Sequence, residues 1–313
     1  MLFMAPLISI CIPAYKNVEY LKRLLDSIAT QTFRDFEVII TDDSNDNSVY
    51  DYINSNNRGF LLSYNKNEKP LGSPENWNAA VRRAKGDWIK IMHHDDWFSS
   101  NSALDVFVQN IKEHPSRNFF FCSYQNKYED GKIKNIVPPN AFRKLILKHP
   151  PALLSSNIIG PPSVTIYKND TTIFFDGRLK WLVDIDFYIT YLRKAEPFYI
   201  GQSLINIGIH EDQVTKHSFL RPEIEIPEHL IVLNKIGKDS LKNIWVYDAF
   251  WRLVRNLKIT TLQELSVHGR EDLPIPGKLE QIIKFQKKLP SASLSFGPFS
   301  KIAMFISYLF SGN

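Results

Sequence analysis

The sequence predicts an α/β protein: a Rossmann-like, mostly parallel sheet with helices on both faces, followed by a mainly helical C-terminal extension. Over roughly the first 125 residues, apolar runs of strand length alternate with segments of helical periodicity. These runs are continuously apolar, as expected of strands that are covered on both faces. With 313 residues, the chain is long enough to bury a large core of this kind.

The elements of the first half follow one another in order. Residues 7–13 form the first apolar run, and the next segment places Leu21, Leu24 and Ile28 on one face of a helix. The second run, 36–41, ends in a cluster of acidic and amide side chains that marks a turn. Two further strands are expected at 60–64 and 87–92, and two further helices at about 48–53 and 74–84.

The pattern changes in the second half of the chain. From about residue 126, proline pairs and aromatic residues interrupt the alternation, and we interpret this part as an addition to the same sheet. Beyond residue 229 the sequence is mostly helical, with Trp245, Ala249 and Leu253 at helical spacing. We therefore predict one domain at 1–228, divided near residue 125, and a helical extension at 229–313.

Composition and charge exclude several classes of protein. The 38 basic and 33 acidic residues give a net charge of +5, which is too small and too scattered for a nucleic-acid-binding surface. Cys11 and Cys122 lie in apolar runs, which excludes a disulfide framework and favours a reduced, cytosolic chain. Residues 1–14 lack the basic start of a signal peptide, and the apolar run 302–310 is about half as long as the ~20 residues that span a bilayer.

Acidic pairs after two predicted strands are the strongest functional signal. His93-His94-Asp95-Asp96 follows the run 88–92, and Asp42-Asp43 follows the run 36–41. Because ligands of open parallel sheets bind beyond the carboxyl ends of the strands, the two pairs are expected to converge. Neighbouring carboxylates repel unless a cation or bound hydroxyls compensate. The alternative is structural: a helix cap for Asp95 or Asp96, and an ordinary acidic turn for Asp42-Asp43.

Two later segments also carry candidate groups. His210 follows an apolar run, and its imidazole is either a ligand for a metal or phosphate or a structural group. Asp184 and Asp186 lie in an apolar, helical stretch, where burial raises the pKa of a carboxyl group and favours proton acceptance. The alternative for Asp184 is capping of that helix.

Taken together, these residues resemble the inverting family 2 glycosyltransferases, which have the GT-A fold. The resemblance covers about residues 6–215 and is most specific up to residue 98. It rests on the segments Ile8-Ser9-Ile10-Cys11-Ile12-Pro13-Ala14-Tyr15, Leu25-Asp26-Ser27-Ile28, Gln31-Thr32, Phe36-Glu37-Val38-Ile39-Ile40, Asp42-Asp43, Asn76-Trp77-Asn78, Ala84-Lys85-Gly86 and Asp95-Asp96-Trp97.

The resemblance implies roles for the matching residues. Residues 1–125 would bind the nucleotide sugar, and 126–228 would lie on the acceptor side. Asp184 would be the catalytic base. Mn²⁺ or Mg²⁺ would be bound by Asp96, Asp95 and His210. The donor would contact Pro13, Ala14, Tyr15, Asp42, Asp43, Asn78, Asp95 and His210.

The chain departs from the family pattern at three places. His93 stands where an aspartate is usual, Lys16 replaces a common asparagine, and the acidic turn 42–48 is one residue shorter. The first change removes the Asp-x-Asp form of the metal motif. It concentrates metal binding on Asp96, with Asp95 turned to the ribose.

The implied reaction moves a sugar from a nucleotide donor to a hydroxyl of a glycan or lipid-linked glycan, in polysaccharide or surface-glycan synthesis. A UDP-sugar is preferred because the family most often uses uridine. A cation stabilises negative charge on the departing diphosphate, while a carboxylate accepts the proton of the attacking hydroxyl. A single displacement of this kind inverts the anomeric centre.

Two other functions use the same residues. One is a binding module for sugar nucleotides or glycans that has lost its chemistry, which the His93 departure suggests and the retained carboxylates oppose. The other is an iron oxygenase with His93, Asp95 and His210 as ligands and Arg221 holding a keto acid. Such oxygenases are mostly antiparallel β proteins, which the alternating pattern of this chain disfavours.

The C-terminal segment has two interpretations. Four lysines precede the apolar run 302–310, namely Lys278, Lys284, Lys287 and Lys288. This combination either lies on an anionic membrane surface, at the inner face of the cell membrane, or forms a helix that docks on the protein's own core.

Overall fold

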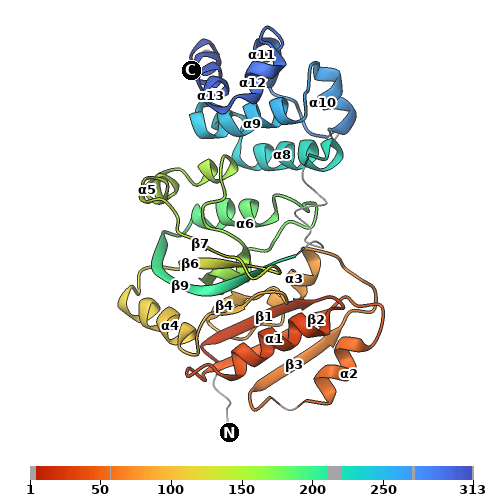
Figure 1. Ribbon diagram of the computed structural model, residues 1–313, viewed down its shortest axis with the longest axis vertical. Helices are drawn as coiled ribbons and strands as arrows, with labels where there is room; N and C mark the ends of the chain where they lie inside the picture. The colour runs from red at the N-terminus through yellow and green to blue at the C-terminus, as the bar shows by residue number, and fades with distance from the viewer. Residues whose placement is uncertain (1–4, 57, 211–219, 270–271, 312–313) are drawn as a thin grey trace. The chain divides into compact units, whose positions relative to one another are not determined.

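The computed structural model describes residues 5–56, 58–210, 220–269 and 272–311. The chain forms two compact units, each assembled from more than one stretch of sequence. The first comprises Met1–Leu147, Ile158–Gly177 and Thr190–Glu211, and the second comprises Lys148–Asn157, Arg178–Ile189 and Asp212–Asn313. Figure 1 labels their helices and strands along the colour gradient from the N- to the C-terminus.

A nine-stranded sheet forms the first unit, with the order β3-β2-β1-β4-β8-β6-β9-β5 and with β7 paired to β6. Its strands are β1 (Ile8–Ala14), β2 (Phe36–Asp42), β3 (Leu61–Lys66), β4 (Trp88–Ile91), β5 (Trp97–Phe98), β6 (Phe119–Tyr128), β7 (Ile133–Ile136), β8 (Thr165–Lys168) and β9 (Pro197–Ile209). Strands β1 to β4 are parallel, and β8 joins them in the antiparallel sense. The predicted mostly parallel α/β sheet is therefore confirmed, and strands from the second half of the chain extend it.

Helices pack on this sheet because their apolar positions repeat with helical spacing. Helix α1 (Val18–Ala29) begins where the Asn17 side chain accepts the backbone N–H of Tyr20, and it buries Leu21, Leu24, Leu25 and Ile28. The other helices of this part are α2 (Ser48–Asn54), α3 (Glu75–Val81), α4 (Ala103–Glu113) and α5 (Asn140–Lys148). The four strands and three helices predicted for residues 7–92 are all present, with bounds shifted by a few residues.

A close backbone contact explains the glycine of the Ala84-Lys85-Gly86 motif. Ser9 in β1 donates to the carboxylate of Glu37 in β2, and the Gly86 N–H donates to the Ser9 hydroxyl. A Cβ atom on Gly86 would lie 2.6 Å from the backbone nitrogen of Ser9. Only glycine therefore lets the chain enter β4 at this distance from β1.

The second unit is mainly helical. It holds the first turns of α6 (Val183–Leu192), together with α8 (Pro222–Ile236), α9 (Ile244–Asn256), α10 (Leu262–His268), α11 (Gly277–Gln286), α12 (Ser291–Ser295) and α13 (Gly297–Phe310). Its core centres on α9, where Tyr247, Phe250 and Trp251 are buried. Among the described residues, no helix combines the length and the apolar character that a bilayer span requires.

Candidate functional site

The polar ends of three predicted strands lie at one edge of the sheet. Ala14, the last residue of β1, is in register with Asp42 of β2, and the Asp43 N–H donates to the Ala14 carbonyl. At the end of β4, the Met92 N–H donates to the carbonyl of Cys11. The convergence expected from parallel topology is therefore present, and Tyr15 follows this edge as an exposed side chain.

The two aspartates after β2 have different environments. Asp42 is fully buried, and its oxygens accept hydrogen bonds from the Ser44 N–H and the Tyr64 hydroxyl. Both carboxylate oxygens of Asp42 therefore have partners within the protein, and its expected contact with the donor stays a prediction. The Asp42 carboxylate stabilises the acidic turn through the hydrogen bond from the Ser44 N–H.

Asp43 fixes the loop that follows β3. Its Oδ1 accepts from the Asn67 side chain at 2.7 Å and from the Leu71 N–H at 3.0 Å, while its Oδ2 accepts from the Gly72 N–H at 2.8 Å. A carboxylate oxygen can accept two hydrogen bonds, so Oδ2 has room for one more donor. Asp43 is therefore able to bind a nucleoside while it holds this loop in place.

The Asn76-Trp77-Asn78 motif positions side chains in two directions. Asn76 donates to the carbonyls of Ala14 and Thr41, which ties α3 to the ends of β1 and β2. Asn78 is fully buried, and its amide exchanges hydrogen bonds with both backbone groups of Phe175 and donates to Glu75. Both of its amide hydrogens are therefore used internally, and the expected contact of Asn78 with the donor stays a prediction. Asn76, which we did not select from the sequence, is the asparagine at the strand ends.

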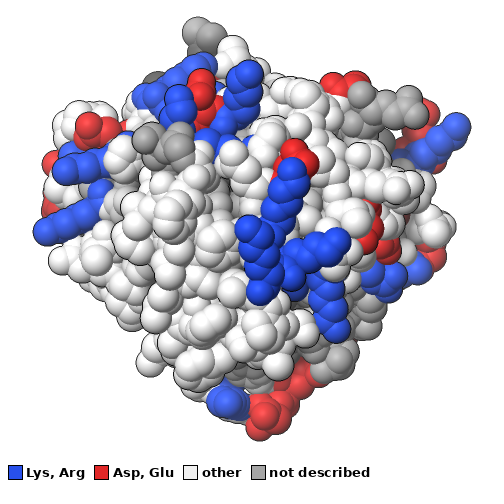
Figure 2. Space-filling view, turned by 90° about the horizontal axis from the view of Figure 1, so that it is seen from above, with Lys and Arg blue, Asp and Glu red and all other residues white. Residues whose placement is uncertain are grey.

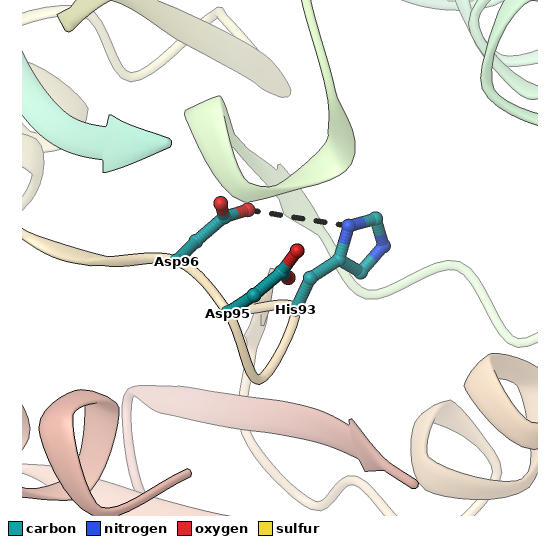
Figure 3. Close-up of side chains that lie close together, drawn as sticks. All are labelled: His93, Asp95 and Asp96. Carbon is teal, nitrogen blue, oxygen red and sulfur yellow. Dashed lines mark ion pairs between the residues drawn. The ribbon is translucent and has the colours of Figure 1, made fainter. Parts of the chain in front are cut away.

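The turn after β4 gathers three potential metal ligands. His93, Asp95 and Asp96 each present a ligand atom, and these atoms lie within 4.8 Å of one another. Figure 3 shows the carboxylate of Asp96 and the ring of His93 directed toward the same space, with the Asp95 carboxylate beside them. The His93 Nδ1 and Asp96 Oδ2 atoms are 4.0 Å apart, which is longer than a direct hydrogen bond.

The two adjacent carboxylates have opposite pKa shifts. Burial, and next the charge of Asp95, raise the pKa of Asp96 well above its ordinary value. Burial is the largest single effect and opposes ionisation of Asp95, but the hydrogen bond to His210 and the electrostatic interactions with His94, His93 and His210 together outweigh it and lower the pKa of Asp95 to about 2. A site with one stable carboxylate and one that is costly to ionise favours a bound positive charge.

The nitrogen ligand of this group is His93. Burial lowers the pKa of His93 to about 4, so its imidazole is neutral and keeps a lone pair at neutral pH. Its Nε2 atom is buried and makes no hydrogen bond among the described residues, and Trp77 packs against the ring at 4.6 Å. A neutral imidazole with two carboxylates is a donor set that suits Mn²⁺, so these residues fit a divalent cation.

His210 lies beside the three-residue group. Its Nε2 atom hydrogen-bonds to Asp95 Oδ2 at 2.9 Å, and its ring packs 5.0 Å from that of Tyr20. In this position it orients the Asp95 carboxylate, and its assignment as a metal ligand stays a prediction. The two-histidine iron site also needed His210 as a ligand, so this geometry does not support that alternative.

A buried hydrogen-bond network that we did not predict supports the turn after β4. The hydroxyl of Ser163 accepts the His93 N–H at 3.0 Å and hydrogen-bonds to the Asp96 carboxylate. The carbonyl of Ser163 accepts a hydrogen bond from the ammonium group of Lys90. This lysine is fully buried beside the rings of Phe98 and Phe107. Burial lowers the pKa of Lys90 to about 7. A lysine inside the apolar run 88–92 was the only signal of this network in the sequence.

Arg23 and His94 complete the surroundings of Asp95. Arg23 donates to the Asp95 carbonyl at 2.7 Å, and its guanidinium stacks 3.7 Å above the centre of the Trp97 ring. Burial lowers the pKa of His94, which hydrogen-bonds to the backbone of Pro13. The predicted donor loop at Pro13 and Ala14 is thereby linked to the turn after β4.

The second unit carries the candidate base. Asp184 lies in the first turn of α6, where Oδ2 accepts from the Asn157 amide at 2.7 Å and Oδ1 accepts from the Ile185 N–H at 2.9 Å. Burial raises the pKa of Asp184 to about 6, as its apolar surroundings predicted, although part of the residue is still exposed. Asp186 is buried and forms an ion pair with Lys235 at 2.6 Å. Of the two aspartates, Asp184 is thus the one that is partly exposed and forms no ion pair with Lys235.

Comparison with known proteins identifies the family of this chain. Residues 9–161 match the model of glycosyl transferase family 2. This part of the chain is therefore a domain of that family. Among its relatives, an uncharacterized glycosyltransferase of Haemophilus influenzae is 28% identical over 213 residues, covering 65% of this glycosyltransferase and 69% of the relative. The chondroitin synthase of Pasteurella multocida is 24% identical over 305 residues, which cover 89% of this chain and 30% of the synthase.

Solved structures show the same architecture for this glycosyltransferase. S. aureus TarS 1–349 in complex with UDP superposes with a TM-score of 0.61 at 17% identity, covering 98% of this chain and 90% of TarS 1–349. A mannosyltransferase of Pyrobaculum calidifontis in complex with GDP-Man and Mn²⁺ gives a TM-score of 0.54 at 14% identity, covering 99% of this chain and 86% of that enzyme. These likenesses confirm the GT-A fold.

Proposed function

We propose that this glycosyltransferase moves a sugar from a UDP-linked donor to a hydroxyl of a glycan or lipid-linked glycan, with inversion and with Mn²⁺ or Mg²⁺. The observation that carries the proposal is the His93, Asp95 and Asp96 group, which follows β4 at the same sheet edge as Asp43. The UDP complex of TarS and the Mn²⁺ complex of the mannosyltransferase support the choice of donor and metal. The likeness to chondroitin and hyaluronan synthases supports a role in polysaccharide or surface-glycan synthesis.

Different residues of the donor site bind the nucleoside and the cation. Asp43 accepts a hydrogen bond from the nucleoside through Oδ2, next to the backbone of Pro13 and Ala14, and Tyr15 provides an exposed ring beside them. Asp96, Asp95 and His93 hold the cation, while His210 and Ser163 orient the carboxylates. When bound, the cation supplies positive charge for the oxygens of the departing diphosphate.

The acceptor end relies on Asp184. Its carboxylate takes the proton of the acceptor hydroxyl as the oxygen forms its bond to the anomeric carbon and the bond from that carbon to the diphosphate breaks. A pKa of about 6 suits this role, because the group is ionised at neutral pH yet basic enough to accept a proton. The attack proceeds in one displacement, so the sugar transferred to the acceptor has the inverted configuration at its anomeric carbon.

The location follows from the same proposal. Nucleotide sugars are made in the cytoplasm, and Cys11 and Cys122 are both buried free thiols, which fits a reducing compartment. We place the enzyme in the cytoplasm, at the inner face of the membrane when its acceptor is lipid-linked.

Calorimetry with UDP, GDP and dTDP, each with and without Mn²⁺, tests the proposal. We expect UDP to bind, and its affinity to fall at least tenfold when the metal is removed. Asp96→Asn keeps the shape of the side chain but removes a charged ligand, so it should abolish the metal dependence. Tighter binding of GDP or dTDP than of UDP would refute the choice of a UDP-linked donor. The absence of metal-dependent binding of all three nucleotides would refute the whole proposal. Binding without sugar transfer would favour the alternative of a non-catalytic module.

A further inference from the structure

Helix α13 packs on its own unit through its small residues and exposes its large apolar ones. Its buried positions are Ser300, Ala303, Met304 and Ser307. The opposite face presents Phe299, Ile302, Phe305, Ile306, Leu309 and Phe310, which are between 36% and 83% exposed. These positions recur every three or four residues and therefore form one continuous stripe along the helix. We call them the α13 stripe.

Specific contacts fix this orientation. The Trp251 indole donates to the Ser300 hydroxyl at 3.0 Å, and the hydroxyls of Tyr247 and Ser307 are 2.7 Å apart. Farther along the helix, the Tyr308 hydroxyl donates to the carbonyl of Lys242 at 2.6 Å. Rotating α13 to bury its stripe would break these bonds and leave buried polar groups without partners. The helix thus docks on the protein, yet the stripe stays outside, which combines the two interpretations that the sequence left open.

The surroundings of the stripe are basic. From residue 281 to the end of the sequence there is no Asp or Glu, while Lys284, Lys287, Lys288 and Lys301 lie in this stretch. Lys284, Lys287 and Lys288 are exposed at the end of α11, which packs against α13. Lys284 forms an ion pair with Glu280, and Lys301 forms one with Asp248, so the proposal relies chiefly on Lys287 and Lys288. Figure 2, seen from above relative to the view of Figure 1, shows a broad uncharged area beside side chains of Lys and Arg.

The occupant of this surface must be both apolar and anionic. Six large apolar side chains on one helix form a patch of the kind that marks an interface in a soluble protein. A second copy that used the same patch in a symmetric dimer would present the same stretch of sequence, in which there is no Asp or Glu to pair with the lysines. An anionic lipid surface instead accepts the apolar stripe among its acyl chains and neutralises the lysines.

We propose that the α13 stripe inserts into an anionic membrane surface and that the lysines of α11 contact the lipid headgroups. With 14 residues the helix is about 21 Å long, so it lies along the interface and does not span the bilayer. This inference is independent of the transfer chemistry, because neither the stripe nor the lysines belong to the donor site.

Sedimentation of the full-length protein with vesicles tests the inference. We expect binding to phosphatidylcholine vesicles that contain phosphatidylglycerol, weak binding to phosphatidylcholine alone, and weaker binding as salt increases. Ile302→Ser combined with Leu309→Ser should lower the partition coefficient at least tenfold. The matched control is Val267→Ser, which removes another exposed apolar side chain from helix α10 of the same unit.

A second pair of variants separates charge from apolar insertion. Lys287→Gln with Lys288→Gln should weaken vesicle binding several-fold, whereas Lys22→Gln with Lys112→Gln removes the same charge elsewhere and should not. UDP binding should be unchanged in all these variants, so failure of the donor proposal would be seen separately. The inference is overturned if the protein ignores anionic vesicles, if it binds neutral ones equally well, or if the stripe variant still binds. It is also overturned if the stripe variant instead dissociates a dimer in analytical ultracentrifugation.

Discussion

The proton acceptor proposed at Asp184 can be tested through the hydrogen bond that holds it. The Asn157 amide donates to Asp184 Oδ2 at 2.7 Å, and this bond favours the ionised carboxylate, whereas burial, the larger effect, favours the neutral form. Backbone hydrogen bonds from Ile185 and Asp184 also favour the ionised form, and the balance of all these effects places the pKa of Asp184 at about 6. Because a general base must be ionised, turnover should be lost as the pH falls through about 6.

The size of the effect follows from these contacts. With a pKa of about 6, the carboxyl is about 90% ionised at pH 7 and about 10% ionised at pH 5, so kcat should fall roughly tenfold between them. A hydrogen bond to a charged group contributes about 1.5–3 kcal/mol, and about 1.4 kcal/mol corresponds to one pH unit. Since Asp184 is partly exposed, water replaces some of a lost bond. Asn157→Leu should therefore move the midpoint of the kcat profile upward by about one pH unit.

The assay is the release of UDP at saturating donor and Mn²⁺, measured from pH 5 to pH 9. Asn157→Leu should approach the kcat of the unmodified enzyme at pH 9 and lose most of it at pH 6. Asp184→Asn should lower kcat by about 10²–10⁴-fold at every pH while leaving UDP affinity nearly unchanged.

Asp186→Asn is the control for the pH profile. It breaks the buried ion pair with Lys235, and it should therefore lower thermal stability without moving the midpoint. A midpoint that stays in place in Asn157→Leu, or a normal kcat in Asp184→Asn, would refute the assignment of the base.

Two further predictions concern the framework of the donor site. Gly86→Ala forces a Cβ atom to within 2.6 Å of the Ser9 nitrogen, so we expect it to cost about 3 kcal/mol and to lower the melting temperature clearly, whereas Gly201→Ala, with open space around it, should leave the temperature unchanged. Equal melting temperatures for the two variants would contradict this reasoning. Ser163→Ala removes the hydroxyl shared by the His93 N–H and the Asp96 carboxylate, so calorimetry should show metal-dependent UDP binding weakened about 10–100-fold, and an unchanged affinity would show that the hydroxyl has no such role.

The sequence alone determined the framework of the first unit. Continuous apolar runs predicted the buried strands β1, β2 and β4, and the spacing of Leu21, Leu24 and Ile28 predicted the buried face of α1. Parallel topology then required the polar residues after these strands to meet at one edge. Such inferences succeed because hydrophobic burial has the period of the local backbone and leaves a regular trace in the sequence.

Only the tertiary structure decided which partners the side chains around the site have. The sequence suggested Asn78 and His210, and the fold adds Asn76 at the strand ends and His93 beside the carboxylates. It also gave Asp186 a partner that the sequence did not indicate, because the ion pair with Lys235 joins residues 49 positions apart. Ser163 reaches His93 across 70 positions in the same way. At the ends of strands and in turns, side-chain direction depends on partners that are distant in sequence, and the local pattern of residues does not contain that information.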